Sequence, residues 1–230
     1  MFYRFSFCLL ILFFANSLNS QTPQQSYFEW TQLPFSKEEL AERRANLISE
    51  LTSENKNGIV LFPARDGFSF GETFRQLDNF YYFTGMELPN AILAIEVPSG
   101  KTTVFTPAMD MRFYSESRPN DFPGRPLLND PEIVKQTGLT LNPIEGFPIY
   151  MNSIGNSSIL IDNGRQGDVR LASDKYITTY TPVQILMLAL KKKHPDVTFE
   201  NCYEAITKLR MVKSDAEIAI MRKAVNITVA

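Results

Sequence analysis

Residues 74–85 read FRQLDNFYYFTG, and after a short connection AILAIEV follows at 91–97 and KTTVF at 101–105. The first segment is dense in aromatic side chains and ends at Gly85. The two later segments are short apolar runs, and the sequence Pro98-Ser99-Gly100 between them is typical of a turn. This arrangement predicts a β-hairpin with the aromatic side chains of residues 80–83 packed in the core beside it.

A helix and a strand are predicted before this region. Ser36 and Glu39 form a capping box at a helix start. Apolar residues then recur at helical spacing up to Leu51, which places Arg43 and Arg44 on the other, polar faces. Residues 59–62, IVLF, follow as a short strand of the buried type.

Further elements are predicted from the same signals, with helices at 131–136, 144–153 and 182–193 and strands at 158–162 and 197–199. Helices that alternate with short strands are typical of an α/β domain whose mixed sheet is flanked by helices. We expect this domain to occupy residues 36–200.

For residues 201–230 the sequence predicts a linker followed by one helix. Ser214 and Glu217 form a second capping box. Behind it, four apolar residues share one face of the helix, namely Ile218, Met221, Val225 and Val229. This face needs a covering surface, so the helix either docks back on residues 36–200 or is the first element of a following domain. In the second case, we expect it to be ordered only against that domain.

Residues 1–20 have the form of a secretory signal peptide. Arg4 supplies the positive start, residues 5–15 are apolar, and small residues suitable for cleavage follow. The apolar run of about 11 residues is short of the roughly 20 that a membrane-spanning helix needs. We therefore expect a secreted or periplasmic protein that does not span a membrane, with residues 21–35 as a polar lead-in.

The composition argues against several functions. The net charge is −2 and the pI is near 5.6, which disfavours nucleic-acid binding through a broad basic face. The chain has one histidine and two cysteines, and Cys8 lies in the signal segment, so a zinc site of His and Cys ligands is excluded. A metal site made of carboxylates remains open by count.

Two segments carry a family resemblance. Their matching features are Arg75-Gln76, Phe80, Tyr82 and Thr84-Gly85 in the first, and Leu209-Arg210, Lys213-Ser214, Glu217-Ile218 and Arg222-Lys223-Ala224 in the second. In this order they resemble the Xaa-Pro aminopeptidases. The resemblance covers residues 36–230 but only about the first half of the usual length of the family.

The resemblance implies a metallopeptidase that acts on peptides with proline at the second position. Such enzymes use a divalent metal pair, commonly manganese, held by two Asp, one His and two Glu. In the family these ligands lie in a pita-bread catalytic domain, past the helix that residues 201–230 resemble. Residues 36–200 then correspond to the N-terminal domain, and the chain itself carries no catalytic residue and no metal ligand. The resemblance further implies a homo-oligomer.

Three residues are candidates for substrate or subunit contact. Phe122 and Arg125 fall where family members carry a loop that reaches a neighbouring active site, and Arg75 is the third. Arg75 is alternatively a buried structural charge paired with an acid. Structural roles are expected for the other residues of the first motif, namely Gln76, Phe80, Tyr82, Thr84 and Gly85.

The remaining polar candidates have simpler interpretations. Asp162 and Asp174 imitate two family ligands but precede Leu209, so we predict a turn after the strand at 158–162 in place of a metal site. We expect His194 to be exposed at a helix end next to a solvated run of lysines at 191–193. Cys202 is expected to be a packing or surface thiol.

Three functions remain open. The first is the N-terminal part of a secreted Xaa-Pro aminopeptidase, serving assembly and active-site access. The second is a stand-alone, non-catalytic module for association or binding. The third is an unrelated small α/β enzyme, for which the sequence offers no active-site set.

Overall fold

The computed structural model describes residues 33, 35–66, 74–108, 128, 131–155, 157–165 and 180–229. The predicted signal peptide at 1–20 and three of the residues discussed above, Phe122, Arg125 and Asp174, lie outside them. In the described part, the strands are β1 (Ile59–Pro63), β2 (Ile92–Glu96), β3 (Thr102–Thr106), β4 (Leu141–Pro143), β5 (Ile159–Ile161) and β6 (Phe199–Asn201). The helices are α1 (Lys37–Ser53), α2 (Asp78–Thr84), α3 (Pro131–Thr137), the 3-10 turn η2 (Ile144–Gly146), α4 (Phe147–Ser153), α6 (Pro182–Lys193), α7 (Tyr203–Met211) and α8 (Asp215–Val229).

The described strands form one mixed sheet in the order β4-β3-β2-β1-β5-β6. The β2–β3 pair is the predicted hairpin, and β1 joins it antiparallel, with Leu61 opposite Ala94. β5 and β6 extend the sheet beside β1 as parallel strands, and β4 runs parallel to β3. The prediction of an α/β domain with a mixed sheet and flanking helices is therefore confirmed.

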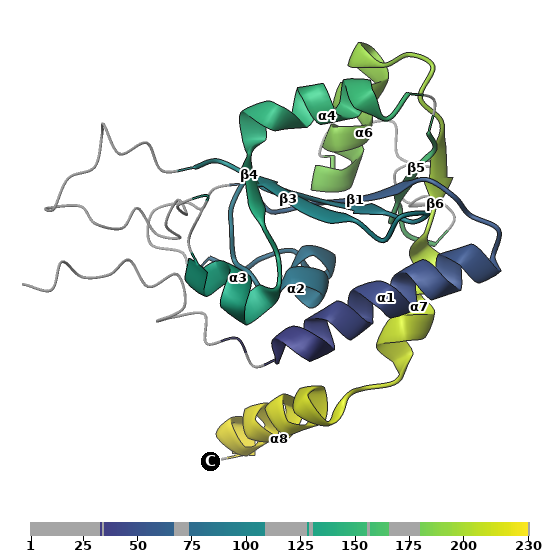
Figure 1. Ribbon diagram of the computed structural model, residues 1–230. Coiled ribbons are helices and arrows are strands. Elements are labelled where there is room, and N and C mark those ends of the chain that lie inside the picture. The colour runs from purple at the N-terminus through teal and green to yellow at the C-terminus, as the bar shows by residue number, and fades with distance from the viewer. Residues whose placement is uncertain are drawn as a thin grey trace, which may run out of the picture.

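Helices cover both faces of the sheet, giving three layers (Figure 1). α4 and α6 lie on one face, and α1, α2, α3 and α7 lie on the other. Because neighbouring residues of a strand point to opposite faces, β1 contributes side chains to the hydrophobic cores on both sides of the sheet. Val60 and Phe62 pack toward α1 and α2, while Ile59 and Leu61 pack toward α4 and α6.

The structure adds three elements that the sequence did not predict. α2 is a helix of seven residues within the aromatic segment, β4 is an edge strand of three residues, and α7 is a helix of nine residues in the segment predicted as a linker. α2 and β4 are too short for a periodic pattern to reveal, since one helical turn takes about 3.6 residues. The final short strand lies at 199–201, two residues later than predicted.

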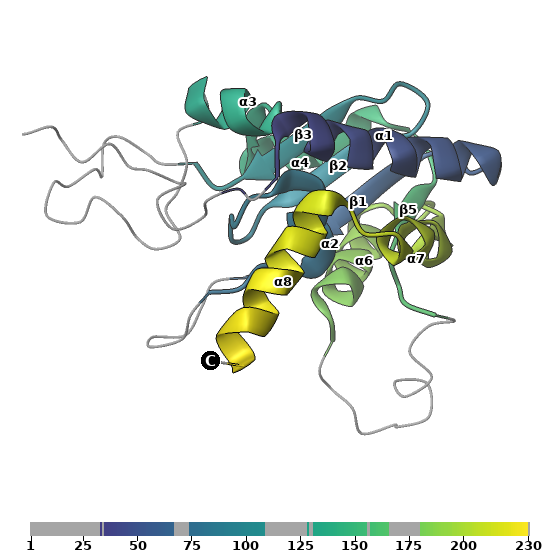
Figure 2. The ribbon, with the colours of Figure 1, turned by 90° about the horizontal axis from the view of Figure 1, so that it is seen from below.

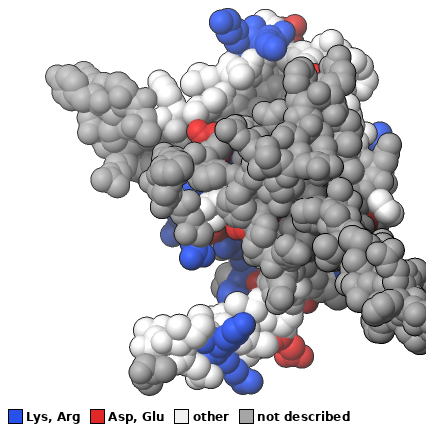
Figure 3. All heavy atoms as spheres, turned by 90° about the vertical axis from the view of Figure 1, so that its left-hand side faces the viewer, with Lys and Arg blue, Asp and Glu red and all other residues white. Residues whose placement is uncertain are grey.

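α8 projects away from the three layers (Figures 1 and 2). Most of its apolar side chains are not covered, since Met221 is 54% exposed, Val225 59% and Ile227 70%, whereas Ile218 is half-buried. In the view of Figure 3 the helix is the largely uncharged projection at the bottom, with Lys and Arg along one side. The apolar side of α8 is therefore not docked on the described part of residues 36–200, although the first turn of the helix contacts α1. No helix in the described ranges has the length and apolarity that crossing a membrane requires.

Gly85 ends α2 in the left-handed conformation, with φ of 69°, and a Cβ there would lie 2.7 Å from Cδ2 of Leu33. Gly164 has a similar φ of 70°, but nothing lies within 4 Å of its Cβ position. We expect Gly164→Ala to lower the free energy of unfolding by about 1 kcal/mol, through backbone strain alone.

Gly85→Ala is expected to cost about 2 kcal/mol or more, because crowding adds to the same strain. Urea denaturation of both variants measures the difference. Equal losses would contradict the close packing of Gly85.

Candidate functional site

Two neighbouring arginines of α1 are buried where the sequence pattern placed them on polar faces. Arg43 is 5% exposed and Arg44 is 7% exposed. That expectation was wrong because helical spacing assigns a charged side chain to solvent by default. Here the backbone carbonyls of other helices supply the polar partners that make burial tolerable.

Arg44 bridges the ends of two short helices. Its Nη1 donates to the carbonyl oxygen of Phe83 in α2 at 2.8 Å, and its Nη2 donates to that of Thr137 in α3 at 3.4 Å. Burial lowers the pKa of the guanidinium to about 10, so it remains charged near neutral pH. A cation at a helix C-terminus also interacts favourably with the helix dipole.

The two helices that Arg44 joins end in the same way. The hydroxyl of Thr84 donates to the carbonyl four residues earlier at 2.7 Å and accepts from the backbone N–H two residues later at 3.0 Å. Thr137 repeats both bonds at 2.7 and 3.1 Å. Gly85 and Gly138 follow, each with φ of 69°. These threonines and glycines turn the chain within one residue of each helix end.

Arg43 lies at the edge of the same junction. Its guanidinium carbon lies 3.8 Å from the ring centre of Phe35 and 4.3 Å from that of Tyr82. Nη1 donates to the backbone carbonyl of Tyr82 at 3.0 Å, and Nη2 pairs with Glu39 at 2.6 Å. A second carboxylate, that of Glu217 in α8, lies 3.8 Å from Nη2. The rings of Phe35 and Tyr82 thus lie against the planar guanidinium of Arg43, and the Tyr82 carbonyl and Glu39 bind its edge.

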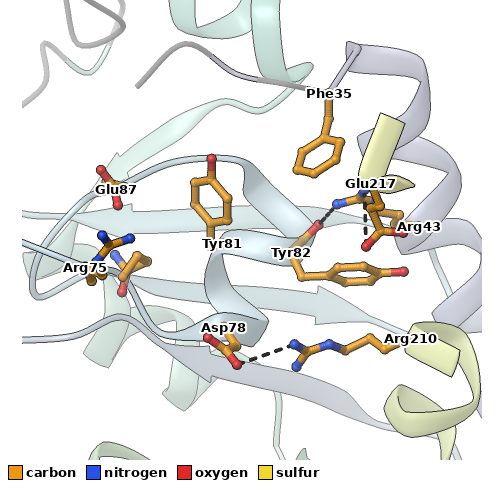
Figure 4. Close-up of a pocket in the computed structure, with 10 residues that line it drawn as sticks. Phe35, Arg43, Arg75, Asp78, Tyr81, Tyr82, Glu87, Arg210 and Glu217 are labelled. Atoms are coloured by element: carbon orange, nitrogen blue, oxygen red, sulfur yellow. Dashed lines mark hydrogen bonds and ion pairs between the residues drawn. The ribbon is translucent and has the colours of Figure 1, made fainter. Parts of the chain in front are cut away.

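A hollow of about 410 Å³ opens beside Arg43, between α1, α2 and the start of α8 (Figure 4). It combines aromatic rings with charges of both signs. The lining residues are Phe35, Arg43, Arg75, Gln76, Asp78, Tyr81, Tyr82, Glu87, Arg210 and Glu217.

Gln76 fixes the chain on the far side of this hollow. Its Oε1 accepts from the backbone N–H of Arg65 at 2.7 Å, and its Nε2 donates to the carbonyl of Leu88 at 2.9 Å. Arg75 itself is exposed, so its interpretation as a buried charge is wrong. Near it, partial burial raises the pKa of the Glu87 carboxyl, and Arg75 acts in the opposite direction.

The other motif residues lie in the packing around α2. Phe80 is fully buried among the side chains between α1 and the sheet. Tyr82 forms one wall of the Arg43 site, and Thr84 and Gly85 form the end of α2 described above. The other two candidates for contact, Phe122 and Arg125, lie outside the described residues.

α7 ties the end of the domain to α1 and α2. Lys208 pairs with Glu50 and, at 3.2 Å, with Glu54. Arg210 donates to the side-chain oxygen of Asn79 at 3.1 Å and lies 3.4 Å from the Asp78 carboxylate. Arg210 belongs to the second motif and Asp78 lies within the segment 74–85 that carries the first, so the structure brings the two motif segments together in one junction.

The described residues do not form a metal site. Among them no group of three or more His, Cys, Asp or Glu side chains is placed to hold a metal ion. Asp162 is engaged in a turn, where it accepts from the Gly164 N–H at 3.0 Å and from Asn79 Nδ2 at 2.6 Å. The described side chains therefore do not fit a metal pair, which the family resemblance places in a different domain, and we assign no metal-dependent step to them.

The remaining reactive side chains have structural positions. Cys202 caps the start of α7 and is fully buried, and burial raises the pKa of its thiol. His194 caps the end of α6 and is half-buried, less exposed than expected. The lysines at 191–193 are exposed in the last turn of α6, as predicted.

Comparison with known proteins gives a consistent result. Residues 40–113 match the family model described as the aminopeptidase P N-terminal domain. A Botryotinia fuckeliana protein named as a Xaa-Pro aminopeptidase is 30% identical over 151 residues, which are 66% of this chain and 28% of that protein. The chain therefore spans less than a third of the length of this curated relative.

Solved structures share the fold. A Bacillus anthracis protein assigned as an aminopeptidase P has a TM-score of 0.64 and 23% identity, with 82% of this chain and 43% of that chain covered. Zinc-substituted Escherichia coli aminopeptidase P in complex with product has a TM-score of 0.57 and 18% identity, with 83% and 42% covered.

Replacing Arg44 tests the junction. Arg44→Met keeps most of the side-chain volume but leaves two buried carbonyl oxygens without their donors. At about 1–3 kcal/mol for each unsatisfied group, we expect the free energy of unfolding to fall by about 3 kcal/mol.

The matched control is Arg75→Met, which removes an exposed guanidinium from the same region and is expected to change stability by less than about 0.5 kcal/mol. Urea denaturation measures both variants. A similar small effect from the two substitutions would show that Arg44 does not hold the helix ends.

Proposed function

Because the chain carries the N-terminal domain of the aminopeptidase P family, we propose that it is the non-catalytic N-terminal region of a secreted Xaa-Pro aminopeptidase. The observation that carries this proposal is the position of the match. The family model for the N-terminal domain fits residues 40–113, and the chain corresponds to only 28% of its fungal relative. The signal-like segment at 1–20 supports export.

The surface of α8 supports a following domain. Its apolar positions span about half of the helix circumference at about 3.6 residues per turn. Four of these side chains are large and exposed, namely Ile220, Met221, Val225 and Ile227. Arg222, Lys223 and Asn226 form the opposite, polar side. A helix with such a wide apolar face normally packs that face against a core. We propose that α8 is buried against the catalytic domain that continues the chain.

In this proposal the downstream domain and residues 36–200 have different roles. The downstream domain supplies the divalent metal pair, which we propose to be manganese, and the catalytic residues. Residues 36–200 serve assembly of a homo-oligomer and access of peptides with proline at the second position. No step of peptide hydrolysis is assigned to the described residues.

An activity comparison tests the proposal. The purified chain is expected to release no residue from a Xaa-Pro peptide, with or without added Mn²⁺. The polypeptide extended by the coding sequence downstream of Ala230 is expected to release the residue before proline and to lose this activity on chelation.

Two results would overturn the proposal. One is metal-dependent turnover by the chain alone that survives a contamination control, which would return Asp162 and Asp174 to consideration. The other is a downstream sequence without Asp, His and Glu ligands, which would favour a stand-alone association module.

A further inference from the structure

The start of α8 is tied to α1 although the rest of the helix is not packed on the domain. The connection from α7 is non-helical at residues 212–214. The hydroxyl of Ser214 donates to Oε1 of Glu39 at 2.6 Å, and Oε1 of Glu217 lies 3.8 Å from Nη2 of Arg43. The pair of Glu217 and Arg43 is thus a polar contact between a side chain of α8 and α1.

Arg43 provides a rigid anchor for this contact (Figure 4). Its guanidinium is stacked between Phe35 and Tyr82, and two of its nitrogens already bond to the Tyr82 carbonyl and to Glu39. A planar guanidinium held on both faces loses little further freedom when it binds another carboxylate. Arg43 therefore presents a preformed cationic edge to α8.

Glu217 joins this anchor to the first turn of the helix. Its Oε2 accepts from the backbone N–H of Ser214 at 2.9 Å, and the hydroxyl of Ser214 accepts from the N–H of Glu217 at 3.1 Å. This reciprocal pair is a capping box, which defines where a helix begins. One oxygen of the Glu217 carboxylate thus belongs to the cap at the start of α8, and the other oxygen faces Arg43.

We propose that Arg43, Glu39, Ser214 and Glu217 form a latch that fixes the direction in which α8 leaves the domain. Arg43 is the positioning residue, because it holds both carboxylates while its own geometry is set by Phe35 and Tyr82. The latch rests on contacts of the described residues and not on the peptidase assignment. If the proposed catalytic domain continues α8, the latch also sets the orientation of that domain.

The substitutions can separate the latch from the helix cap. Glu217→Gln keeps an acceptor for the capping box, where Gln serves as well as Glu, and removes the charge that faces Arg43. Arg43→Met removes the guanidinium and retains an apolar chain between the two rings. Glu42→Gln is the matched control, because Glu42 is an exposed acid of α1 next to Arg43 that takes no part in the latch.

Residual dipolar couplings of the ¹⁵N-labelled chain measure the orientation of α8. In the unsubstituted chain and in Glu42→Gln, we expect the couplings of residues 215–228 to fit the alignment tensor of β1, β2 and β3. In Glu217→Gln and Arg43→Met, we expect them to lose at least about half of their magnitude, since a freed helix averages its orientation faster than milliseconds.

The couplings of the three strands report whether each variant is folded. If Arg43→Met loses them, Glu217→Gln decides, because this residue lies outside the packed layers. α8 couplings that remain on the tensor of the strands in Glu217→Gln would overturn the latch. So would α8 couplings that are already averaged in the unsubstituted chain.

Discussion

The carbonyl oxygens at the ends of α2 and α3 lie inside the domain, where water cannot satisfy them, and the guanidinium of Arg44 supplies donors to both. α2 and α3 are each seven residues long, too short to be stable alone. They persist because α1 closes their ends and because their apolar side chains pack against the sheet. The position of the aromatic segment, and hence of the hollow beside it, depends on this constraint.

The elements with strong local signals were predictable, and the contacts between them were not. The N-cap at Ser36, the hairpin turn at Pro98–Gly100 and the helix at 182–193 were placed within a residue or two, because caps and turns act over a few neighbouring residues. The Glu39 half of the predicted capping box was wrong, because this carboxylate pairs with Arg43 and Ser214. Arg43 and Arg44 were misplaced because their partners lie 39 and 93 residues away in the chain. The Thr-Gly pairs at 84–85 and 137–138 are the one local signal that marks both partner helices.

Arg43, the neighbour of Arg44 on α1, connects the buried ends of α2 and α3 to helix α8. Arg44 faces inward to the helix ends, while Arg43 faces outward to Glu39 and Glu217. The same turn of α1 therefore organises the domain and contacts the helix that leaves it. If the proposed catalytic domain follows α8, this turn of α1 lies next to the point where the two domains join.

One buried guanidinium thus holds two helix ends at once, and native-state hydrogen exchange can follow each end separately. The amides of Gly85 and Gly138 bond to the carbonyls of Tyr81 and Val134 at 2.7 and 2.9 Å, so each amide reports one helix end. In Arg44→Met, we predict that both amides exchange faster together, by about tenfold or more, since about 1.4 kcal/mol corresponds to a factor of ten. Acceleration at only one glycine, or at neither, would contradict the shared role of Arg44.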